Sequence, residues 1–249
     1  MFKDLKKKVI VITGGSGFLG QQYCLAFLKN KCQVINLDII NTNKKVFFLK
    51  CDITKEKDLI DAKKKIIKKF KKIDVLINNA ARNPTPNQTK KNNNFENLDL
   101  TEVLKDFQIG LIGSILSSKV FGTQMLKQKK GNIINISSDL GIIAPDQRLY
   151  KKNFVKPVSY SVIKHGILGL TKYLASYWGT KNIRCNAFAP GGMKNSNNLS
   201  IQKKLKKLIP INRMANINEY NDIILFLASD ASSYINGATI VADGGRTII

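Results

Sequence analysis

The 249-residue sequence contains few cysteines, a single histidine and few acidic residues. Its four cysteines form no CxxC pair, and one histidine leaves too few ordinary ligands for a zinc centre, so no metal site is expected. So few cysteines in a chain of this size also exclude a small disulfide-stapled fold. We therefore expect a protein of a reducing, cytoplasmic compartment.

Long apolar runs are also missing. No stretch approaches the roughly 18 consecutive apolar residues that suggest a transmembrane helix, so the sequence predicts no membrane partner. The basic first eight residues precede an apolar run of only residues 9–12, which is too short for the core of a signal peptide.

Acidic residues number only 17 against 41 basic ones, which gives a formal net charge of +24. Such an excess suits a nucleic-acid partner, because clustered cations neutralise phosphates. All but five of the basic residues are lysine, however, and lysine is less suited than arginine to bidentate recognition of bases. In residues 59–70 the lysines lie between apolar residues at helical spacing, which is typical of a solvated helix face. We expect no specific nucleic-acid partner.

Short β-branched runs alternate with longer amphipathic stretches along the chain. The predicted strands are 9–13, 33–37, 46–50, 75–78, 132–137, 184–189 and 239–241, and the predicted helices are 18–30, 56–70, 100–126, 160–178 and 217–229. This alternation predicts an α/β, Rossmann-type doubly wound parallel sheet of about seven strands, with helices on both faces. The length and the 43% apolar content suit a single dinucleotide-binding domain over residues 1–249.

Three segments interrupt this alternation, near residues 82–98, 139–157 and 192–208. Each follows a predicted strand and is irregular and polar. In an open parallel sheet, ligands bind at the carboxyl ends of the strands. We therefore expect these segments to form substrate-side loops.

A glycine-rich turn, Thr-Gly-Gly-Ser-Gly-Phe-Leu-Gly, occupies residues 13–20 between the first predicted strand and the first predicted helix. Gly14 permits a tight turn, Gly17 allows the backbone to approach a pyrophosphate, and Gly20 lets helix and strand pack closely. Asp38 ends the second strand, where a carboxylate binds the adenosine ribose and repels a 2′-phosphate. The pattern predicts binding of NAD, with NADP less favoured. The alternative for Asp38 is a helix N-cap or turn residue.

A second group of residues suits proton chemistry. Tyr160 and Lys164 are four residues apart, so on a helix they share one face. A neighbouring ammonium lowers the pKa of a phenol and makes it a proton shuttle for an alcohol or a ketone. Ser138 follows a predicted strand and could bind the same oxygen. A Tyr-x-x-x-Lys pair alone is commonplace, and the glycine-rich turn in the same chain makes it informative.

Together these motifs resemble the short-chain dehydrogenase/reductase family of classical length. The resemblance rests on the segments 13–20, Asp38, Cys51-Asp52-Ile53, Asn78-Asn79-Ala80-Ala81, Asn135-Ile136-Ser137-Ser138, Tyr160-Ser161-Val162-Ile163-Lys164, Pro190-Gly191-Gly192 and Asp243-Gly244-Gly245. It implies bound NAD(P), with Tyr160 as acid/base, Lys164 as pKa modulator and ribose ligand, and Ser138 orienting the substrate oxygen. The implied cofactor contacts are Gly14, Ser16, Gly17, Phe18, Leu19, Asp38, Asp52, Ile53, Asn79, Ala80, Ala81, Tyr160, Lys164, Pro190, Gly191 and Met193. The family also implies a homodimer or homotetramer.

Three positions depart from the family pattern. Phe18 stands where classical members usually carry glycine, and Gly110 replaces the helix-borne asparagine of a proton relay. The segment 144–157 is an insertion before Tyr160. With Gly110, it resembles a subgroup of surface-sugar and flagellin-modification dehydrogenases. Basic residues of the insertion could meet a phosphate, and polar ones could meet hydroxyls, or all could be ordinary loop residues: Asp146, Gln147, Arg148, Lys151, Lys152 and Lys156.

The resemblance implies an oxidoreductase that interconverts a secondary alcohol and a ketone, with a polar or phosphorylated, sugar-like small molecule as substrate. One alternative is a reductase of 3-ketoacyl thioesters, although a polar insertion suits an acyl chain poorly. A second alternative is a non-catalytic cofactor-binding protein with the same fold, which Phe18 and Gly110 would fit. The intact set of Ser138, Tyr160 and Lys164 favours the enzyme.

Overall fold

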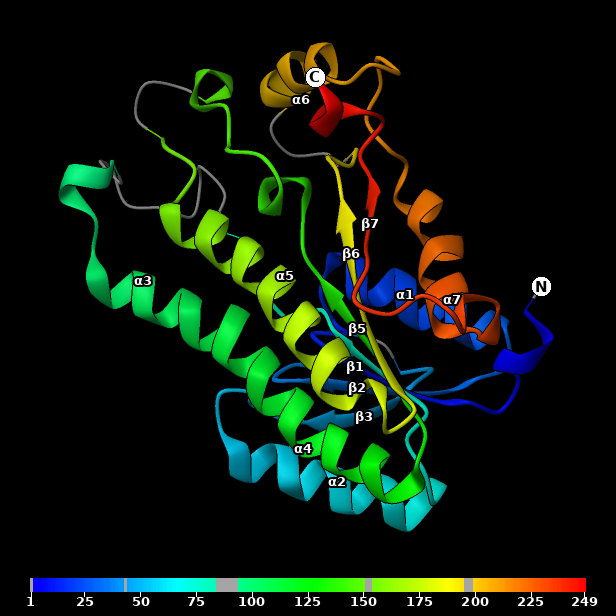
Figure 1. The fold of residues 1–249 in the computed structure, drawn as a ribbon. Coiled ribbons are helices and arrows are strands. Elements are labelled where there is room, and N and C mark those ends of the chain that lie inside the picture. Colours follow the sequence, from blue (N-terminus) through cyan, green and yellow to red (C-terminus); the bar gives the residue numbers. More distant parts are fainter. Residues whose placement is uncertain (1, 43, 84–93, 151–153, 195–198) are drawn as a thin grey trace.

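The structure, a computed structural model, describes residues 2–42, 44–83, 94–150, 154–194 and 199–249. Seven parallel strands form one sheet in the order β3-β2-β1-β4-β5-β6-β7 (Figure 1). The strands are β1 Val9–Thr13, β2 Gln33–Asp38, β3 Phe47–Lys50, β4 Val75–Asn78, β5 Gly131–Ile136, β6 Ile183–Pro190 and β7 Thr239–Ala242. The predicted doubly wound sheet is confirmed, and every predicted strand lies within one residue of its observed bounds.

Alternate residues of the central strand β1 face opposite sides of the sheet, as the period of two in a strand requires. Ile10 and Ile12 pack into a core with α1 and α7, whereas Val9 and Val11 pack into a second core with α2, α4 and α5. Figure 1 shows these two groups of helices on opposite faces. Burial on both faces explains why the strands are almost continuously apolar.

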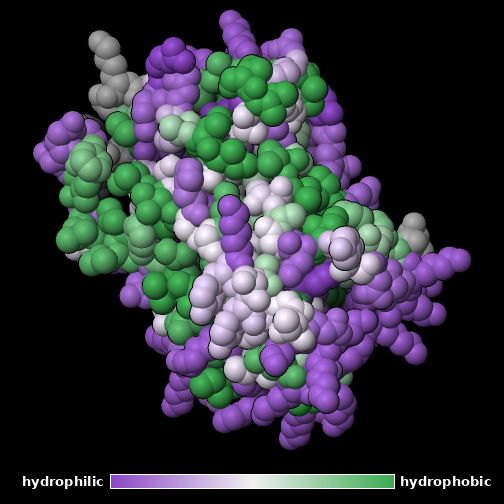
Figure 2. Space-filling view, in the orientation of Figure 1, coloured by the Kyte–Doolittle hydropathy of each residue, from purple (hydrophilic) through white to green (hydrophobic). Residues whose placement is uncertain are grey.

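The helices are α1 Phe18–Lys29, α2 Glu56–Phe70, α3 Leu100–Phe107, α4 Gly113–Gln128, α5 Val158–Gly179, α6 Leu199–Leu205 and α7 Asn221–Ala228. In α2 Leu59, Ala62 and Ile66 are buried and five of the six lysines are exposed, so the predicted solvated face is confirmed. Figure 2 shows hydrophilic side chains around the end of the molecule that carries α2. The short helix α6 was not predicted, and it lies within the segment 192–208 that the sequence suggested to be irregular.

The predicted helix 100–126 forms as α3 and α4, joined by a π-helical turn at Gln108–Ile112. By length and mean hydropathy this continuous helix, Leu100–Gln128, could cross a membrane, although it contains no run of about 18 consecutive apolar residues. Half of its most apolar window is buried inside the fold. Val120, Phe121 and Met125 belong to the core that also contains α2 and α5 residues. Core packing therefore accounts for part of the apolar character of this helix.

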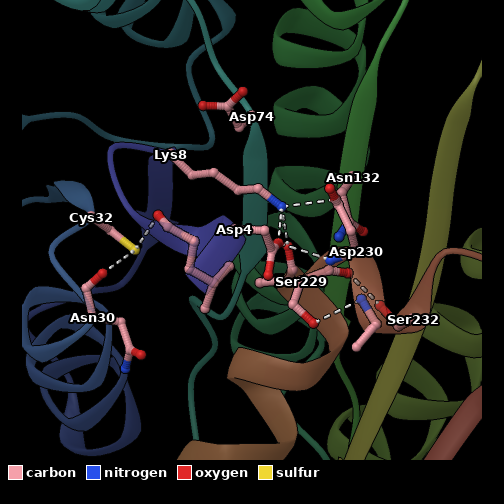
Figure 3. A network of polar contacts seen from close by, with 12 residues as sticks. Asp4, Lys8, Asn30, Cys32, Asp74, Asn132, Ser229, Asp230 and Ser232 are labelled. Carbon is pink, nitrogen blue, oxygen red and sulfur yellow. Dashed lines mark hydrogen bonds and ion pairs between the residues drawn. The ribbon is translucent and has the colours of Figure 1, made fainter. Parts of the chain in front are cut away.

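An ionic network ties the beginning of the chain to the segment after α7 (Figure 3). The Lys8 ammonium donates to Asp4 Oδ2 at 2.7 Å and to Asp230 Oδ1 at 3.0 Å. It also lies 3.3 Å from the Ala228 carbonyl oxygen at the end of α7. Both carboxylates are partly exposed, and the network lies outside the cavity described next.

Candidate active site

A cavity of about 1100 Å³ opens at the carboxyl ends of the strands. Its walls come from the residues after β1, β2, β3, β4, β5 and β6, together with α5 and the segment around α6. Every residue that the sequence analysis assigned to the site lines this cavity: Gly14, Ser16, Gly17, Phe18, Leu19, Asp38, Asp52, Ile53, Asn79, Ala80, Ala81, Ser138, Tyr160, Lys164, Pro190, Gly191 and Met193. The fold therefore brings the glycine-rich turn and the Ser–Tyr–Lys set into one cavity.

The glycine-rich turn has no space for side chains at two of its positions. Gly14 has a φ of +64°, and a Cβ there would lie 2.7 Å from the Cα of Ala80. A Cβ on Gly20 would collide with the carbonyl oxygen of Gly14 and lie 2.7 Å from the Cα of Gly15. The side-chain amide of Asn79 donates to the carbonyl oxygens of Thr13 and Gly14, at 3.1 and 2.9 Å, and fixes the turn.

The amino terminus of α1 begins at this turn and faces the cavity. Gly17 is the N-cap of α1, and no side chain caps the helix there. Uncapped amide groups and the positive end of a helix dipole suit a diphosphate, so the residues present fit a dinucleotide. Phe18 is 54% exposed, and its replacement of the usual glycine leaves the turn intact.

Asp38 ends β2 beside the glycine-rich turn. Its Oδ2 accepts from the amide of Ser16 at 3.0 Å, and its Oδ1 accepts from the amide of Ile39 at 2.7 Å. The carboxylate thus supports a turn, as the alternative interpretation expected, and it also lies in the cavity wall, as the ribose interpretation expected.

Ser138, Tyr160 and Lys164 come from two elements that meet at the cavity floor. Ser138 follows β5, whereas Tyr160 and Lys164 lie one turn apart on α5. The buried Lys164 ammonium donates to the Ile136 carbonyl oxygen at 2.9 Å and lies 5.6 Å from the ring centroid of Tyr160. The predicted shared helix face is therefore present.

The electrostatics of this set differ from the sequence-based expectation. Burial raises the pKa of Tyr160 to about 12, although a hydrogen bond with Ser138 acts in the opposite direction. Burial, with a smaller contribution from Lys156, lowers the pKa of Lys164 to about 8. The expected lowering of the phenol pKa is therefore not found, because desolvation outweighs the hydrogen bond with Ser138. At neutral pH Tyr160 carries its proton and can act as a donor.

A buried ion pair between Arg246 and Asp139 is connected to Ser138 by a hydrogen bond. The guanidinium of Arg246, which lies after β7, contacts Asp139 Oδ2 at 2.5 Å, and both side chains are at most 6% exposed. Asp139 Oδ1 accepts from the Ser138 hydroxyl at 2.8 Å and from the Leu140 amide at 2.8 Å. The last turn of the chain is thus linked through Asp139 to the serine of the site.

Neither Asp139 nor Arg246 is predicted as a site residue from the sequence. Arg246 follows the Asp243-Gly244-Gly245 segment and is one of only five arginines in a lysine-rich chain, which is the one signal that singles it out. Its partner is 107 residues away, so no local pattern could have paired them.

Lys156 reaches the cavity from the insertion. Its ammonium lies 3.9 Å from the ring centroid of Tyr160 and contacts the side-chain oxygen of Asn83, and the residue is only 8% exposed. Gln147 holds its backbone from both sides, by accepting from the Lys156 amide at 3.0 Å and donating to its carbonyl oxygen at 3.3 Å. The backbone of Lys156 is therefore fixed by Gln147, and its ammonium lies beside the phenol ring.

The other polar residues of the insertion have different positions. Arg148 is exposed, its guanidinium is bound by Asp146 at 2.9 Å, and neither residue lines the cavity. Gln147 is hydrogen-bonded to the backbone of Lys156. Lys151 and Lys152 lie outside the described residues. In the described part of the chain, Lys156 is therefore the one cation that the insertion places in the cavity.

Gly110, in the π-helical turn, is packed against α5. A Cβ at this position would lie 2.8 Å from the Cγ2 of Ile163, the residue before Lys164. The Gly110 carbonyl oxygen accepts from the Ser114 hydroxyl at 3.0 Å. The space that an asparagine side chain would need is filled by Ile163, so no side-chain relay passes through position 110.

Comparisons with known proteins agree with this geometry. Residues 19–247 match the family described as enoyl-(acyl carrier protein) reductase. The chain is 31% identical to post-translational flagellin modification protein A of Campylobacter coli, over 97% of this chain and 98% of that protein. It is 30% identical to an NAD-dependent glycerol dehydrogenase of Listeria innocua, over 98% and 96% of the two chains.

Solved structures agree over the whole length as well. A short-chain dehydrogenase of Leptospira borgpetersenii with bound NAD⁺ superposes with a TM-score of 0.90 at 29% identity, covering 99% of this chain and 96% of that one. The structure of ElxO with NADP bound superposes with a TM-score of 0.84 at 27% identity, covering 98% and 100%. The two neighbours thus carry different dinucleotides.

Proposed function

Because the chain belongs to the short-chain dehydrogenase/reductase family and is an NAD(P)-dependent oxidoreductase, we propose that it interconverts a secondary alcohol and a ketone on a polar, sugar-like small molecule. The observation that carries this proposal is the meeting of Ser138, Tyr160 and Lys164 in the cavity that also contains the glycine-rich turn. A protein that only binds a dinucleotide would have no need to keep a proton donor there.

The cofactor residues divide by position along the cavity. The turn from Gly14 to Leu19 would hold the diphosphate, and Asp38 the adenosine ribose. Asp52 and Ile53 would border the adenine. Further contacts would come from the middle and the nicotinamide end of the cavity: Asn79, Ala80, Ala81, Tyr160, Lys164, Pro190, Gly191 and Met193. A carboxylate at Asp38 disfavours a 2′-phosphate, which supports NAD as the preferred cofactor.

The protein residues provide the proton and hold the reacting oxygen. When bound, the nicotinamide supplies or accepts the hydride. Tyr160 donates its proton to the carbonyl oxygen during reduction, which suits a phenol that is protonated at neutral pH. The Ser138 hydroxyl would donate to the same oxygen by turning its proton from Asp139 Oδ1 toward the substrate. Lys164 stabilises the phenolate that remains, since an ammonium nearby favours the charged form.

A sugar-like substrate is supported by the flagellin-modification relative and by the polar groups at the substrate end of the cavity, among them Lys156, Asp139 and Arg246. Surface-glycan biosynthesis in the cytoplasm, by a homodimer or homotetramer, fits this proposal. Reduction of a 3-ketoacyl thioester is the second candidate, supported by the matched family description and by the apolar residues Ile201, Leu205 and Met214 in the cavity wall.

The test combines a cofactor titration with one variant. Wild type and Tyr160→Phe are titrated with NADH and with NADPH by nicotinamide fluorescence, and turnover is then measured on sugar alcohols and ketoses. We expect both proteins to bind NADH more tightly than NADPH, and the variant to lose activity by about 10²–10⁴-fold. Near wild-type turnover in Tyr160→Phe would refute the mechanism, and tighter binding of NADPH would refute the role of Asp38.

A further inference from the structure

Lys156 lies in the cavity as a buried cation without an ionic partner. It is 8% exposed, and none of the ion pairs in the described part of the chain includes it. All 17 acidic residues of the sequence lie in that part. An unpaired buried ammonium is costly, since burial removes its hydration. The ring of Tyr160 and the oxygen of Asn83 compensate only in part, because neither carries a formal negative charge.

The position of this cation relates it to the reacting group. Its Nζ lies over the face of the same ring whose hydroxyl would donate the proton, 3.9 Å from the centroid. A substrate whose oxygen meets the Tyr160 hydroxyl therefore places its neighbouring carbons beside Lys156. Gln147 fixes the backbone of Lys156 through two hydrogen bonds, and the ammonium itself contacts the ring of Tyr160 and the side-chain oxygen of Asn83.

We propose that Lys156 is a specificity-determining residue, whose ammonium binds a carboxylate carried by the substrate on a carbon adjacent to, or one further from, the reacting carbon. This inference rests on the proposed function, because Tyr160 defines where the reacting oxygen lies. It narrows the polar substrate to a hydroxy acid or its oxo acid, which includes sugar acids. The resulting charge-assisted hydrogen bond would compensate the buried charge.

A carboxylate fits this position better than a phosphate does. Lys156 offers one positive charge, which balances a carboxylate monoanion. Asp106 and Asp139 also act on this ammonium and would repel a dianion. Two arginines line the cavity, and both are already paired with carboxylates, Arg82 with Glu102 and Asp106 and Arg246 with Asp139. Neither is free to bind a phosphate through its fork of donors.

The ionisation of Lys156 gives the interaction a pH dependence. Burial lowers the pKa of Lys156 to about 8, against the opposing influence of Asp139 and Asp106. The other titratable groups that face it are Tyr160 and Lys164 on α5. The ammonium is charged below its pKa, so carboxylate affinity should be full at pH 6–7 and should fall as the pH rises through about 8.

The experiment uses hydroxycarboxylates and their uncharged primary amides as matched probes. Lactate with lactamide, glycerate with glyceramide, and gluconate with gluconamide are titrated calorimetrically into the protein saturated with NADH, with which these alcohols cannot be oxidised. Glycerol 1-phosphate and glucose 6-phosphate form the phosphate arm. The proteins are wild type, Lys156→Met, Lys156→Arg and the charge-matched control Lys172→Met, whose lysine is exposed on α5.

We expect at least one acid to bind wild type about tenfold or more tightly than its amide, which is the scale of one charge-assisted hydrogen bond. Lys156→Met should abolish this preference, whereas Lys156→Arg and Lys172→Met should keep it, and NADH affinity should be unchanged throughout. Equal binding of acid and amide in every pair, a preference that survives in Lys156→Met, or tighter Lys156-dependent binding of the phosphates would each overturn the assignment.

Turnover separates this inference from the proposed function. If wild type oxidises the amides as readily as the acids, the oxidoreductase proposal holds and the role of Lys156 fails. If acids bind in a Lys156-dependent manner and no alcohol or ketone in a broad panel is ever turned over with either dinucleotide, the binding site holds and the proposed reaction fails.

Discussion

The two ends of the cavity are built by different means. At the cofactor end the walls follow β1, β2 and β4 directly, and the essential features are glycines without room for a Cβ and an asparagine that binds the turn. At the substrate end the walls come from the insertion, from the segment around α6 and from the last turn of the chain, and charged side chains distant in sequence hold them together. Backbone geometry fixes one end, and long-range ionic contacts fix the other.

The largest loss of stability should come from removing one member of the buried pair of Arg246 and Asp139. Arg246→Met leaves Asp139 buried without its partner, so the free energy of unfolding should fall by about 3–5 kcal/mol. The double variant Asp139→Asn/Arg246→Met should regain much of this loss, because no unpaired charge remains. Urea denaturation measures both. If Arg246→Met lowered the free energy of unfolding by less than about 1 kcal/mol, the ion pair would not be what holds the substrate end of the cavity together.

A smaller effect should follow from adding one methyl group at the cofactor end. Gly20→Ala places a Cβ against the backbone of Gly14 and Gly15, which cannot move away cheaply. We expect a loss of about 1–3 kcal/mol in stability, with weaker NADH binding. Gly169→Ala on α5 is the control, since a Cβ there meets nothing within 4 Å, and it should lower neither quantity. Unchanged NADH binding in Gly20→Ala would show that the turn tolerates a side chain.

The smallest loss of stability should come from breaking the partly exposed ionic network around Lys8. Lys8→Met breaks the network with Asp4 and Asp230, and partly exposed pairs contribute only about 0–1 kcal/mol. Although partial burial acts in the opposite direction, the Lys8 ammonium helps to hold the pKa of Asp4 below its ordinary value of 3.8. A lowered carboxyl pKa stabilises the fold above that value and ceases to do so as the pH falls below it.

Thermal melts of wild type and Lys8→Met between pH 7 and pH 2 measure this difference. The two melting curves should converge at the acid end, and Lys130→Met, which removes a lysine 4.0 Å from Asp230, should resemble wild type throughout. If Lys8→Met destabilised the protein as much as Arg246→Met does, burial would not be what decides how much an ion pair contributes to stability in this molecule.

The same contrast explains what the sequence could predict. Local spacing predicts the strands, most helices and the positions of Gly14, Asp38 and Tyr160. It can do so because the period of a strand and the glycine requirement of a turn each depend on only a few neighbouring residues. The pairing of Asp139 with Arg246 and the position of Lys156 depend on how distant segments meet, which no local pattern records.

Two further differences have physical causes. The short helix α6 is only seven residues long, so its periodicity is too brief to recognise. The pKa of Tyr160 depends on how deeply the fold buries it, and adjacency to Lys164 in sequence says nothing about that depth. The first difference has a local cause and the second a tertiary one.

The contact between Gly110 and Ile163 makes the two positions dependent on each other. An asparagine introduced at position 110 by a single substitution would force its side chain into Ile163. Shrinking Ile163 alone would open a void in the packing between the π-helical turn and α5, which lowers stability. Each residue therefore restricts what the other can be, and an asparagine at position 110 requires a smaller residue at position 163.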